Sequence, residues 1–340
     1  MPQLSPEIDT EIRRFLERSK RPLIVILGPT ASGKTDFSLD LACHVERSRN
    51  ATGSAEIVNA DSHHPSTTLR VTPSFEIVNA DSRQLYKYMD IGTAKINPDE
   101  MRGVTHHLLD VLDPKEEVTA AWYKERATKA IDEVLERGNI PLLVGGSMLY
   151  ISAVIDDLQF VPSPDPAIRK RLDEEYDRDG GAALYAKLQR QDPETAERFS
   201  VRNKPYVIRA IEILETIGTP SSVKRKGDSP YDLLIFGMEW EREELVKRIK
   251  ARTRQLFEKG WIDEVQRLLE RGYSVDDPGM RSQGYRDIAE VLANGKPKID
   301  NGELLDALIE SISAQARQYA KRQMTWWRRD PRIKWIPSKN

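Results

Sequence analysis

The sequence of 340 residues predicts an α/β fold, in which a parallel β-sheet is flanked by helices and interrupted by a helical insertion domain. Two short apolar runs, 22–27 and 141–144, are each followed directly by glycine, as buried parallel strands commonly are. Between these two runs, apolar residues recur at the spacing of helices. The stretch 162–202, rich in charge and opened by three prolines, predicts the insertion.

The predicted elements follow one another along the chain. A first helix is expected over Pro6 to Arg18, with Ser5 as its N-cap. After it we expect, in order, a strand at 22–27, a helix from 35, a helix at 116–137, a strand at 141–144, helices at 169–179, 182–190 and 204–217, a strand at 233–238, and mostly helix from 242 onward. We therefore predict an N-terminal helical extension (1–20), a core (21–158 and 203–340) and a helical insertion (159–202).

Composition narrows the class of protein. Hydrophobic residues make up 39% and charged residues 31%, as in globular proteins with polar surfaces. No apolar run reaches the length of a membrane span, and residues 1–20 lack the features of a secretory signal. The single cysteine, Cys43, excludes an internal disulfide and a cysteine-rich metal site. We expect a cytoplasmic protein without membrane contact.

A glycine-rich motif follows the first predicted strand. Gly28-Pro29-Thr30-Ala31-Ser32-Gly33-Lys34-Thr35 fits the P-loop pattern G-x-x-x-x-G-K-[ST], and it lies between a strand and a helix. Its backbone N–H groups and the helix N-terminus are suited to phosphate, while Lys34 reaches phosphate oxygens and Thr35 holds Mg²⁺. The sheet is therefore predicted to be P-loop NTPase-like. The motif alone does not identify the phosphate compound or the bond that is broken.

A heptapeptide occurs twice after this motif. Glu56–Ser62 and Glu76–Ser82 both read EIVNADS, and the stretch between them lacks an apolar period. We interpret 48–75 as an inserted, poorly ordered loop. Only the second copy continues into Arg-Gln-Leu-Tyr, so we predict that it forms the core strand and that Asp81, rather than Asp61, reaches the site. Adjacent histidines at 63–64 and 106–107 are expected at the surface rather than on a metal, because neighbouring side chains on a strand point apart.

Asp81 ends the predicted strand 76–78. Ligands of open α/β sheets bind beyond the carboxyl ends of strands, so Asp81 is expected to face the P-loop. Its carboxylate could bind metal through water or act as a general base, and it could equally be a helix N-cap. The polar residues that follow, Ser82, Arg83 and Gln84, favour a functional role.

The C-terminal stretch from Ala314 to Asn340 is basic and aromatic. It contains eight Lys and Arg against one acid, Asp330, with tyrosine and tryptophans among them. Cations and aromatics of this kind suit RNA phosphates and bases. Composition alone nevertheless favours a helix that packs its aromatics into the core and leaves its charges in water.

Six motifs together resemble those of bacterial tRNA dimethylallyltransferases, the tRNA isopentenyltransferase family. The resemblance covers about residues 21–330 apart from the insertion. Its motifs are 28–35, 79–95 (NADSRQLYKYMDIGTAK), 145–150 (GGSMLY), 209–212 (RAIE), 283–286 (QGYR) and 319–326 (YAKRQMTW).

The resemblance implies an activity and its partners. It implies transfer of a dimethylallyl group from dimethylallyl diphosphate to the exocyclic amine of the adenosine adjacent to the anticodon, in tRNAs that read codons beginning with U. It further implies Mg²⁺ as cofactor, a tRNA anticodon stem-loop as partner and a monomeric enzyme. Two alternatives remain open: a P-loop small-molecule kinase, and a tRNA- and diphosphate-binding protein inactivated by the insertion.

The resemblance also assigns residues. The P-loop would hold the diphosphate, Asp81 would be the general base, Ser147 would touch the adenosine where the family usually has threonine, and Arg209 would lie near the diphosphate and the RNA backbone. Two positions depart from the family, Tyr206 where arginine is common and Gln283 where isoleucine is frequent. The implied tRNA-binding residues are Asp81, Ser82, Arg83, Gln84, Ser147, Arg169, Tyr206, Arg209, Gln283, Gly284, Tyr285 and Arg286.

Overall fold

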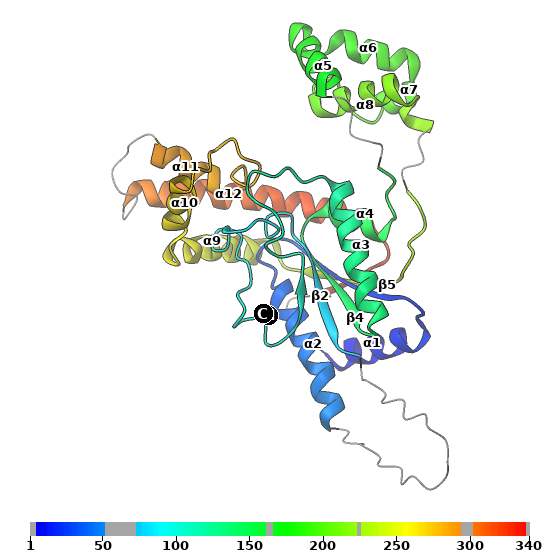
Figure 1. The fold of residues 1–340 in the computed structure, drawn as a ribbon, viewed down its shortest axis with the longest axis vertical. Coiled ribbons are helices and arrows are strands. Elements are labelled where there is room, and N and C mark those ends of the chain that lie inside the picture. Colours follow the sequence, from blue (N-terminus) through cyan, green and yellow to red (C-terminus); the bar gives the residue numbers. More distant parts are fainter. Residues whose placement is uncertain (1–4, 52–72, 161–165, 223–225, 294–301, 338–340) are drawn as a thin grey trace. The chain divides into compact units, whose positions relative to one another are not determined.

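The computed structural model describes residues 5–51, 73–160, 166–222, 226–293 and 302–337. The chain divides into two compact units (Figure 1). Unit 1 comprises Met1–Ile155 and Ser229–Asn340, and unit 2 comprises Asp156–Asp228. Each unit has its own apolar core, and each is described separately below.

A six-stranded sheet forms the centre of unit 1. All strand pairs are parallel, in the order β3-β2-β4-β1-β5-β6, which confirms the predicted parallel sheet. The strands are β1 Pro22–Leu27, β2 Phe75–Ala80, β3 His106–His107, β4 Ile140–Gly145, β5 Asp232–Glu239 and β6 Ile333–Pro337.

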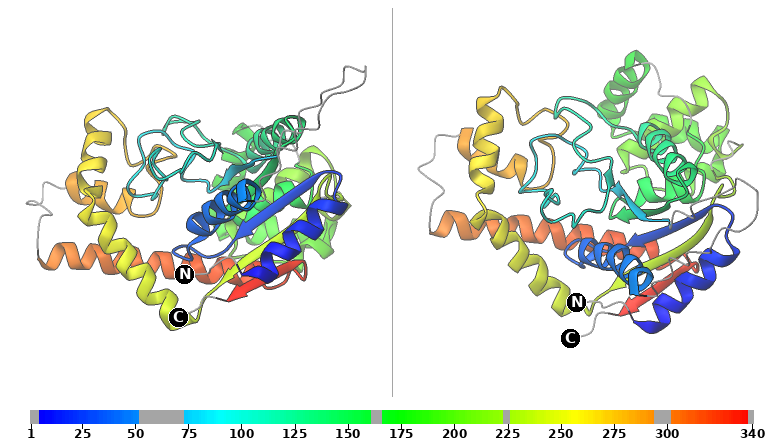
Figure 2. Two further views of the ribbon diagram at one scale, coloured as in Figure 1. Left: turned by 90° about the horizontal axis from the view of Figure 1, so that it is seen from below. Right: turned by 60° about the horizontal axis from the view of Figure 1, so that its bottom comes forward.

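Helices cover both faces of this sheet (Figure 2). α3 Ala120–Glu136 and α4 Met148–Ile155 lie on one face, and α1 Pro6–Arg18 and α2 Lys34–Ala51 lie on the other. Four further helices pack mainly on one another: α9 Arg242–Glu258, α10 Trp261–Glu270, α11 Tyr285–Ala293 and α12 Glu303–Trp327. Side chains alternate along β1, so Val25 packs with α3 and α4 whereas Ile24 and Ile26 pack with α1 and α2. Within the described ranges, every helix is too short or too polar to span a bilayer.

The second copy of the repeated heptapeptide forms β2, as predicted. Every residue of β2 is buried, and Ile77 pairs with Leu142 on β4 and with His106 on β3. The first copy, Glu56–Ser62, lies outside the described residues, as does most of the predicted insertion 48–75. The helix α2 extends to Ala51, beyond the predicted start of that insertion.

Unit 2 is larger than the predicted insertion. It consists of α5 Pro166–Asp179, α6 Ala182–Gln191, α7 Pro193–Ala196, α8 Lys204–Thr216 and a 3-10 turn, η1 Pro220–Ser222. The boundary predicted at 202 lies instead at 228, because the apolar face of α8 packs on α5 and α6. Val207 and Ile211 of α8 and Leu172 of α5 are all buried in this small core. Tyr206 and Arg209 therefore belong to unit 2.

Three local predictions differ from the structure. The helix predicted from 116 begins at Ala120, where the Thr119 side chain caps it by accepting a hydrogen bond from Trp122 N. The strands β3 and β6 were not predicted, since β3 has only two residues and β6 is a short edge strand in a basic stretch. In β3 both histidines form hydrogen bonds, His106 with Val104 O and His107 with Glu76.

Candidate active site

The P-loop connects β1 to α2 as the sequence predicts. Two of its residues have positive φ, Ala31 at 62° and Gly33 at 84°, and these turn the backbone toward the edge of the sheet. Gly28 lies so close to β5 that an added Cβ would be 2.8 Å from Met238 Cβ. Lys34 Nζ donates hydrogen bonds to Gly28 O (2.9 Å) and Pro29 O (2.8 Å). The lysine is thus folded back over the loop.

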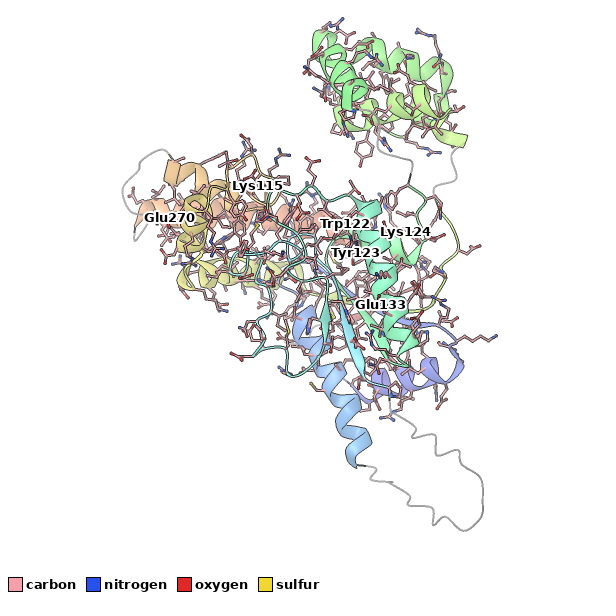
Figure 3. The ribbon with its side chains drawn as sticks, in the orientation of Figure 1. Lys115, Trp122, Tyr123, Lys124, Glu133 and Glu270 are labelled. Carbon is pink, nitrogen blue, oxygen red and sulfur yellow. The ribbon has the colours of Figure 1, made fainter. Side chains whose placement is uncertain are left out.

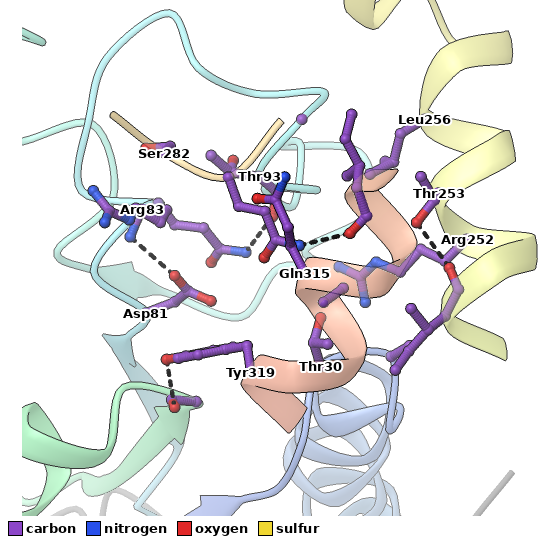
Figure 4. Close-up of a pocket in the computed structure, with 18 of the residues that line it drawn as sticks. Thr30, Asp81, Arg83, Thr93, Arg252, Thr253, Leu256, Ser282, Gln315 and Tyr319 are labelled. Atoms are coloured by element: carbon purple, nitrogen blue, oxygen red, sulfur yellow. Dashed lines mark hydrogen bonds between the residues drawn. The ribbon is translucent and has the colours of Figure 1, made fainter. Parts of the chain in front are cut away.

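Two cations share this region of the molecule. Burial and the charge of Arg252 lower the pKa of Lys34 to about 7, and the negative charge of Asp81 offsets part of that effect. Burial also lowers the pKa of Arg252, which reaches the site from α9 (Figure 4). A bound anion would stabilise the charged forms of both side chains.

A cavity of about 660 Å³ in unit 1 contains both cations. The carboxyl edge of the sheet forms one side of it, and α9, α12 and the loop around 282 form the other sides (Figure 4). Predicted site residues that line the cavity are Thr30, Ala31, Ser32, Gly33, Lys34, Thr35, Asp81, Ser82, Arg83, Gln84, Gln283 and Tyr285. The structure therefore brings the P-loop and the residues after β2 together around one space.

Asp81 does not cap a helix, because a turn rather than a helix follows β2. Its Oδ1 accepts a hydrogen bond from Arg83 N at 2.9 Å, which stabilises the turn after β2 in the manner of a cap (Figure 4). Asn79 fixes the backbone on either side, because its side chain bonds both Asp81 N and Asp81 O. The carboxylate itself lines the cavity opposite the P-loop cations.

Ser147 lies directly beside this turn. Its Oγ accepts a hydrogen bond from Ser82 N at 2.9 Å, and its own N–H donates to Ala80 O at 3.0 Å. The preceding Gly145 is packed so tightly that an added Cβ would lie 2.1 Å from Ala80 O. Tyr123 belongs to α3 (Figure 3); its hydroxyl donates to Asn79 O, and its ring stacks on that of Tyr150. The Asp81 turn is therefore supported by buried groups.

A second cavity, of about 450 Å³, opens on the other side of this turn. Ser147 and Leu149 line it, and it shares Ser82, Arg83 and Tyr319 with the first cavity. Asp81 thus lines the first cavity and Ser147 lines the second. A ligand in one cavity could meet a ligand in the other at this turn.

The helix α12 joins the P-loop to the turn that contains Ser147. Gln323, which is buried, accepts a hydrogen bond from Thr30 N at 3.1 Å and donates to Gly146 O at 2.7 Å. Tyr319 also donates to Gly146 O, at 3.1 Å (Figure 4). Burial and the charge of Asp81 raise the pKa of Tyr319 to about 12, so it remains a hydrogen-bond donor at neutral pH.

The C-terminal stretch packs partly into the core and partly lines the first cavity. Trp327 is buried in the core, as the compositional argument favours, whereas the neighbouring Trp326 is 48% exposed. Arg322 lines the first cavity and stacks on Tyr319, with 5.7 Å between its guanidinium carbon and the ring centre. The helix α12 therefore supplies both core packing and cavity lining.

The QGYR motif divides between the cavity and the core. Gln283 lines the cavity and donates to Ile312 O at 2.8 Å. Tyr285 is fully buried, and its hydroxyl bonds Glu264. Gly284 has φ 84° and packs against Trp261, while Arg286 is exposed and pairs with Glu290 at 2.7 Å. Of the four residues, Gln283 and Tyr285 line the cavity and Arg286 does not.

Three further predicted residues belong to unit 2. Arg169 on α5 and Arg209 on α8 both contact Glu212, at 3.5 and 3.2 Å. Tyr206 lies one turn before Arg209 on α8 and is 59% exposed. The structure thus brings the two arginines to one carboxylate.

Sequence reasoning missed Arg252 and Gln323 as site residues. Arg252 stands among four other cations between 247 and 254, and Gln323 stands in the basic C-terminal stretch. Gln323 lies within the motif 319–326, but the motif itself assigns it no role, and no local feature sets Arg252 apart; each reaches the site only through the packing of a distant helix.

The site fits Mg²⁺ by its donor set. Thr35 begins α2, is exposed, and lines both the first cavity and a small adjoining one. Hydroxyl and phosphate oxygens are ligands that Mg²⁺ prefers, and it usually keeps waters and uses few protein groups. The described residues contain no cluster of three His, Cys, Asp or Glu side chains able to hold a metal.

A glycine-rich P-loop at the carboxyl edge of a parallel sheet, with α/β connectivity, defines a P-loop α/β protein. Residues 84–330 match the family model described as IPP transferase. The chain belongs to this family of prenyltransferases.

Individual relatives agree with the assignment. A tRNA dimethylallyltransferase of Geobacter sulfurreducens is 38% identical over 322 residues, covering 94% of this chain and 92% of that protein. The crystal structure of a tRNA isopentenylpyrophosphate transferase from Bacillus halodurans is 34% identical, with a TM-score of 0.62 and coverage of 94% and 90%. A eukaryotic dimethylallyltransferase acting on tRNA shares the fold, with a TM-score of 0.72 at 22% identity over 94% of this chain and 74% of the other.

Proposed function

We propose that this enzyme transfers the dimethylallyl group of dimethylallyl diphosphate to the exocyclic amine of the adenosine adjacent to the anticodon, in tRNAs that read codons beginning with U. The names of its relatives support tRNA and the dimethylallyl group as substrates. The observation that carries the proposal is the single cavity that holds the P-loop cations and Asp81 together.

The diphosphate binds on the P-loop in this scheme. The backbone N–H groups of Gly33, Lys34 and Thr35, at the start of α2, would face its oxygens, with Lys34 and Arg252 as the charged partners. Neutralising the leaving group favours cleavage of the bond between the allylic carbon and the diphosphate oxygen. Mg²⁺, which Thr35 would help to hold, supplies further neutralisation of the diphosphate when bound.

The adenosine approaches from the side of Asp81 and Ser147. Its exocyclic nitrogen forms the new bond to the allylic carbon, the carbon–oxygen bond breaks, and the amine proton passes to the Asp81 carboxylate. An aromatic amine is a weak nucleophile, so alignment by the neighbouring Ser147 hydroxyl matters as much as proton removal. The base must leave its stack to reach the cavity, and an anticodon loop allows that more readily than a duplex does.

The tRNA contacts follow from the same arrangement. Ser82, Arg83, Gln84 and Gln283 line the cavity that would receive the nucleotide, and Arg286 offers an exposed cation next to it in sequence. Gly284 and Tyr285 support this wall by packing with Trp261. We assign Arg209 to the RNA backbone together with Arg169, since Arg252 already supplies the second cation of the diphosphate site.

A monomeric state and a cytoplasmic location stay predictions.

The two alternative functions predict different activities. A kinase needs transfer of phosphate from a nucleoside triphosphate without RNA. A protein inactivated by the insertion binds both substrates without turnover. The intact β2, with Asp81 at the cavity, favours an active enzyme.

The test is label transfer from radiolabelled dimethylallyl diphosphate to two anticodon stem-loops. One carries adenosine beside the anticodon, and the other carries purine riboside, which lacks the exocyclic amine. We expect label on the adenosine stem-loop only. Absence of label on both, with the protein folded and binding both substrates, would contradict the proposal, and phosphate transfer from ATP to a small molecule would favour the kinase.

A further inference from the structure

Unit 2 contains a buried carboxylate that no step of the proposed reaction uses. The Glu212 side chain on α8 is 0% exposed. A carboxylate withdrawn from water is unfavourable unless cations or hydrogen-bond donors compensate it. The described part of unit 2 places two cations on it, one from each of two helices.

The two cations reach Glu212 from the surface. Arg169 Nε of α5 lies 3.5 Å from Glu212 Oε1, and Arg209 Nη1 of α8 lies 3.2 Å from Oε2. The Arg169 side chain remains 50% exposed and that of Arg209 remains 34% exposed. Arg209 therefore donates a hydrogen bond to one oxygen of the buried carboxylate, whereas Arg169 lies at ion-pair distance from the other, which accepts no hydrogen bond from the described residues.

We propose that Glu212 is a positioning residue that holds Arg169 and Arg209 together as one binding site for an RNA phosphate. This inference rests on the proposed function, which supplies tRNA as the ligand. A guanidinium presents several N–H donors in a rigid plane that matches phosphate oxygens, and fixing two such planes beforehand reduces the entropy lost on binding. Tyr206, exposed one turn earlier on α8, adds an aromatic surface next to the site.

The same helix offers a matched control. Glu215, one turn further along α8, also contacts two cations, Arg171 and Lys187, but its side chain is 22% exposed. Water solvates part of the Glu215 carboxylate, so the positions of Arg171 and Lys187 depend less on this carboxylate. Glu212 and Glu215 differ mainly in burial and in which cations they hold.

The experiment measures binding of a fluorescent anticodon stem-loop to full-length Glu212→Gln and Glu215→Gln over a range of salt concentrations, together with steady-state kinetics. For Glu212→Gln we expect affinity for the stem-loop about tenfold weaker and a salt slope smaller by about one to two, because phosphate contacts are lost. The KM for dimethylallyl diphosphate and the kcat at saturating RNA should not change. Glu215→Gln should resemble the wild type in all of these.

A double-mutant cycle shows whether Glu212 acts through the arginines. In an Arg169→Gln, Arg209→Gln background, Glu212→Gln should cause no further loss of RNA affinity. An equal loss in Glu215→Gln, or an unchanged salt slope in Glu212→Gln, would overturn the inference. If Glu212→Gln does not fold, the two arginine substitutions provide the test. Each alone must weaken RNA binding, and the double variant must lose less affinity than the product of the two single losses. A loss equal to that product would overturn the inference. If the unsubstituted enzyme binds the stem-loop but transfers no prenyl group, the proposed function is contradicted, whereas the inferred phosphate site is not.

Discussion

The two sides of the main cavity differ in charge and in how they are built. The P-loop side is cationic: burial lowers the pKa of both Lys34 and Arg252, and the charge of Arg252 lowers that of Lys34 further. The opposite side carries the Asp81 carboxylate, and the nearby Ser147 hydroxyl lines the adjoining second cavity; each is held by a backbone hydrogen bond. The difference indicates a division of labour, in which one side receives an anionic leaving group and the other receives a nucleophile and its proton.

The two sides are also linked. Gln323 bonds the P-loop at Thr30 N and the opposite turn at Gly146 O, so α12 fixes their separation. An enzyme that only binds phosphate would need the first side alone. Substitutions on either side should therefore separate leaving-group binding from proton transfer.

Apart from the substitution of Asp81, the largest effect is expected on the cationic side. Lys34→Met should lower both transfer and affinity for dimethylallyl diphosphate, with the rate reduced about 10²–10³-fold, because the charge that stabilises the leaving group is lost. Calorimetric binding and single-turnover transfer on the same sample measure both. Loss of transfer with full diphosphate affinity would contradict the assignment of Lys34 to this side.

Arg252→Gln should have the next largest effect. We expect kcat/KM for dimethylallyl diphosphate to fall about 10- to 100-fold, as a charged hydrogen bond contributes about 1.5–3 kcal/mol, while the KM for tRNA does not change. Lys250→Gln on the same helix is the control, since Lys250 is exposed and pairs with Glu310 outside the cavity. Equal effects of the two substitutions would remove Arg252 from the diphosphate site.

A smaller effect is expected on the opposite side. Ser147→Ala removes the acceptor of Ser82 N and should lower kcat/KM for tRNA about two- to tenfold, from a hydrogen bond of about 0.5–1.5 kcal/mol. Ser147→Thr retains the hydroxyl and should be close to the wild type. Kinetics with both substrates varied distinguish the two variants, and equal losses in both would argue against a role for the hydroxyl.

The smallest effect concerns pH. The pKa of Lys34 is about 7 in the free protein, and a bound diphosphate raises it. Above pH 7 binding must therefore take up a proton, and affinity should fall as the pH rises, by at most about tenfold per pH unit. Calorimetry in two buffers of different ionisation enthalpy measures the uptake. Lys34→Arg, which stays protonated, should show none beyond the titration of the ligand itself.

The sequence predicted best those parts of the site that are formed by residues close together in the chain. The P-loop, β2 and the Asp81 turn are contiguous segments whose motifs predict strand, turn and helix directly, and continuity with Arg83 identified the correct copy of the heptapeptide. Arg252 and Gln323 could not be found in this way, because they depend on the packing of α9 and α12. The boundary of unit 2 was misplaced for a related reason, since the apolar face of α8 has no local feature that assigns it to α5 rather than to the sheet.

The central claim is that Asp81 accepts the proton while the P-loop side binds the diphosphate independently. It is tested most directly by measuring transfer and diphosphate affinity for Asp81→Asn beside Asp61→Asn, the same substitution in the identical heptapeptide outside the described residues. We predict that Asp81→Asn loses about 10²–10⁴-fold in transfer and keeps its diphosphate affinity, while Asp61→Asn retains both. Full transfer by Asp81→Asn, or loss of transfer in Asp61→Asn alone, would contradict the account.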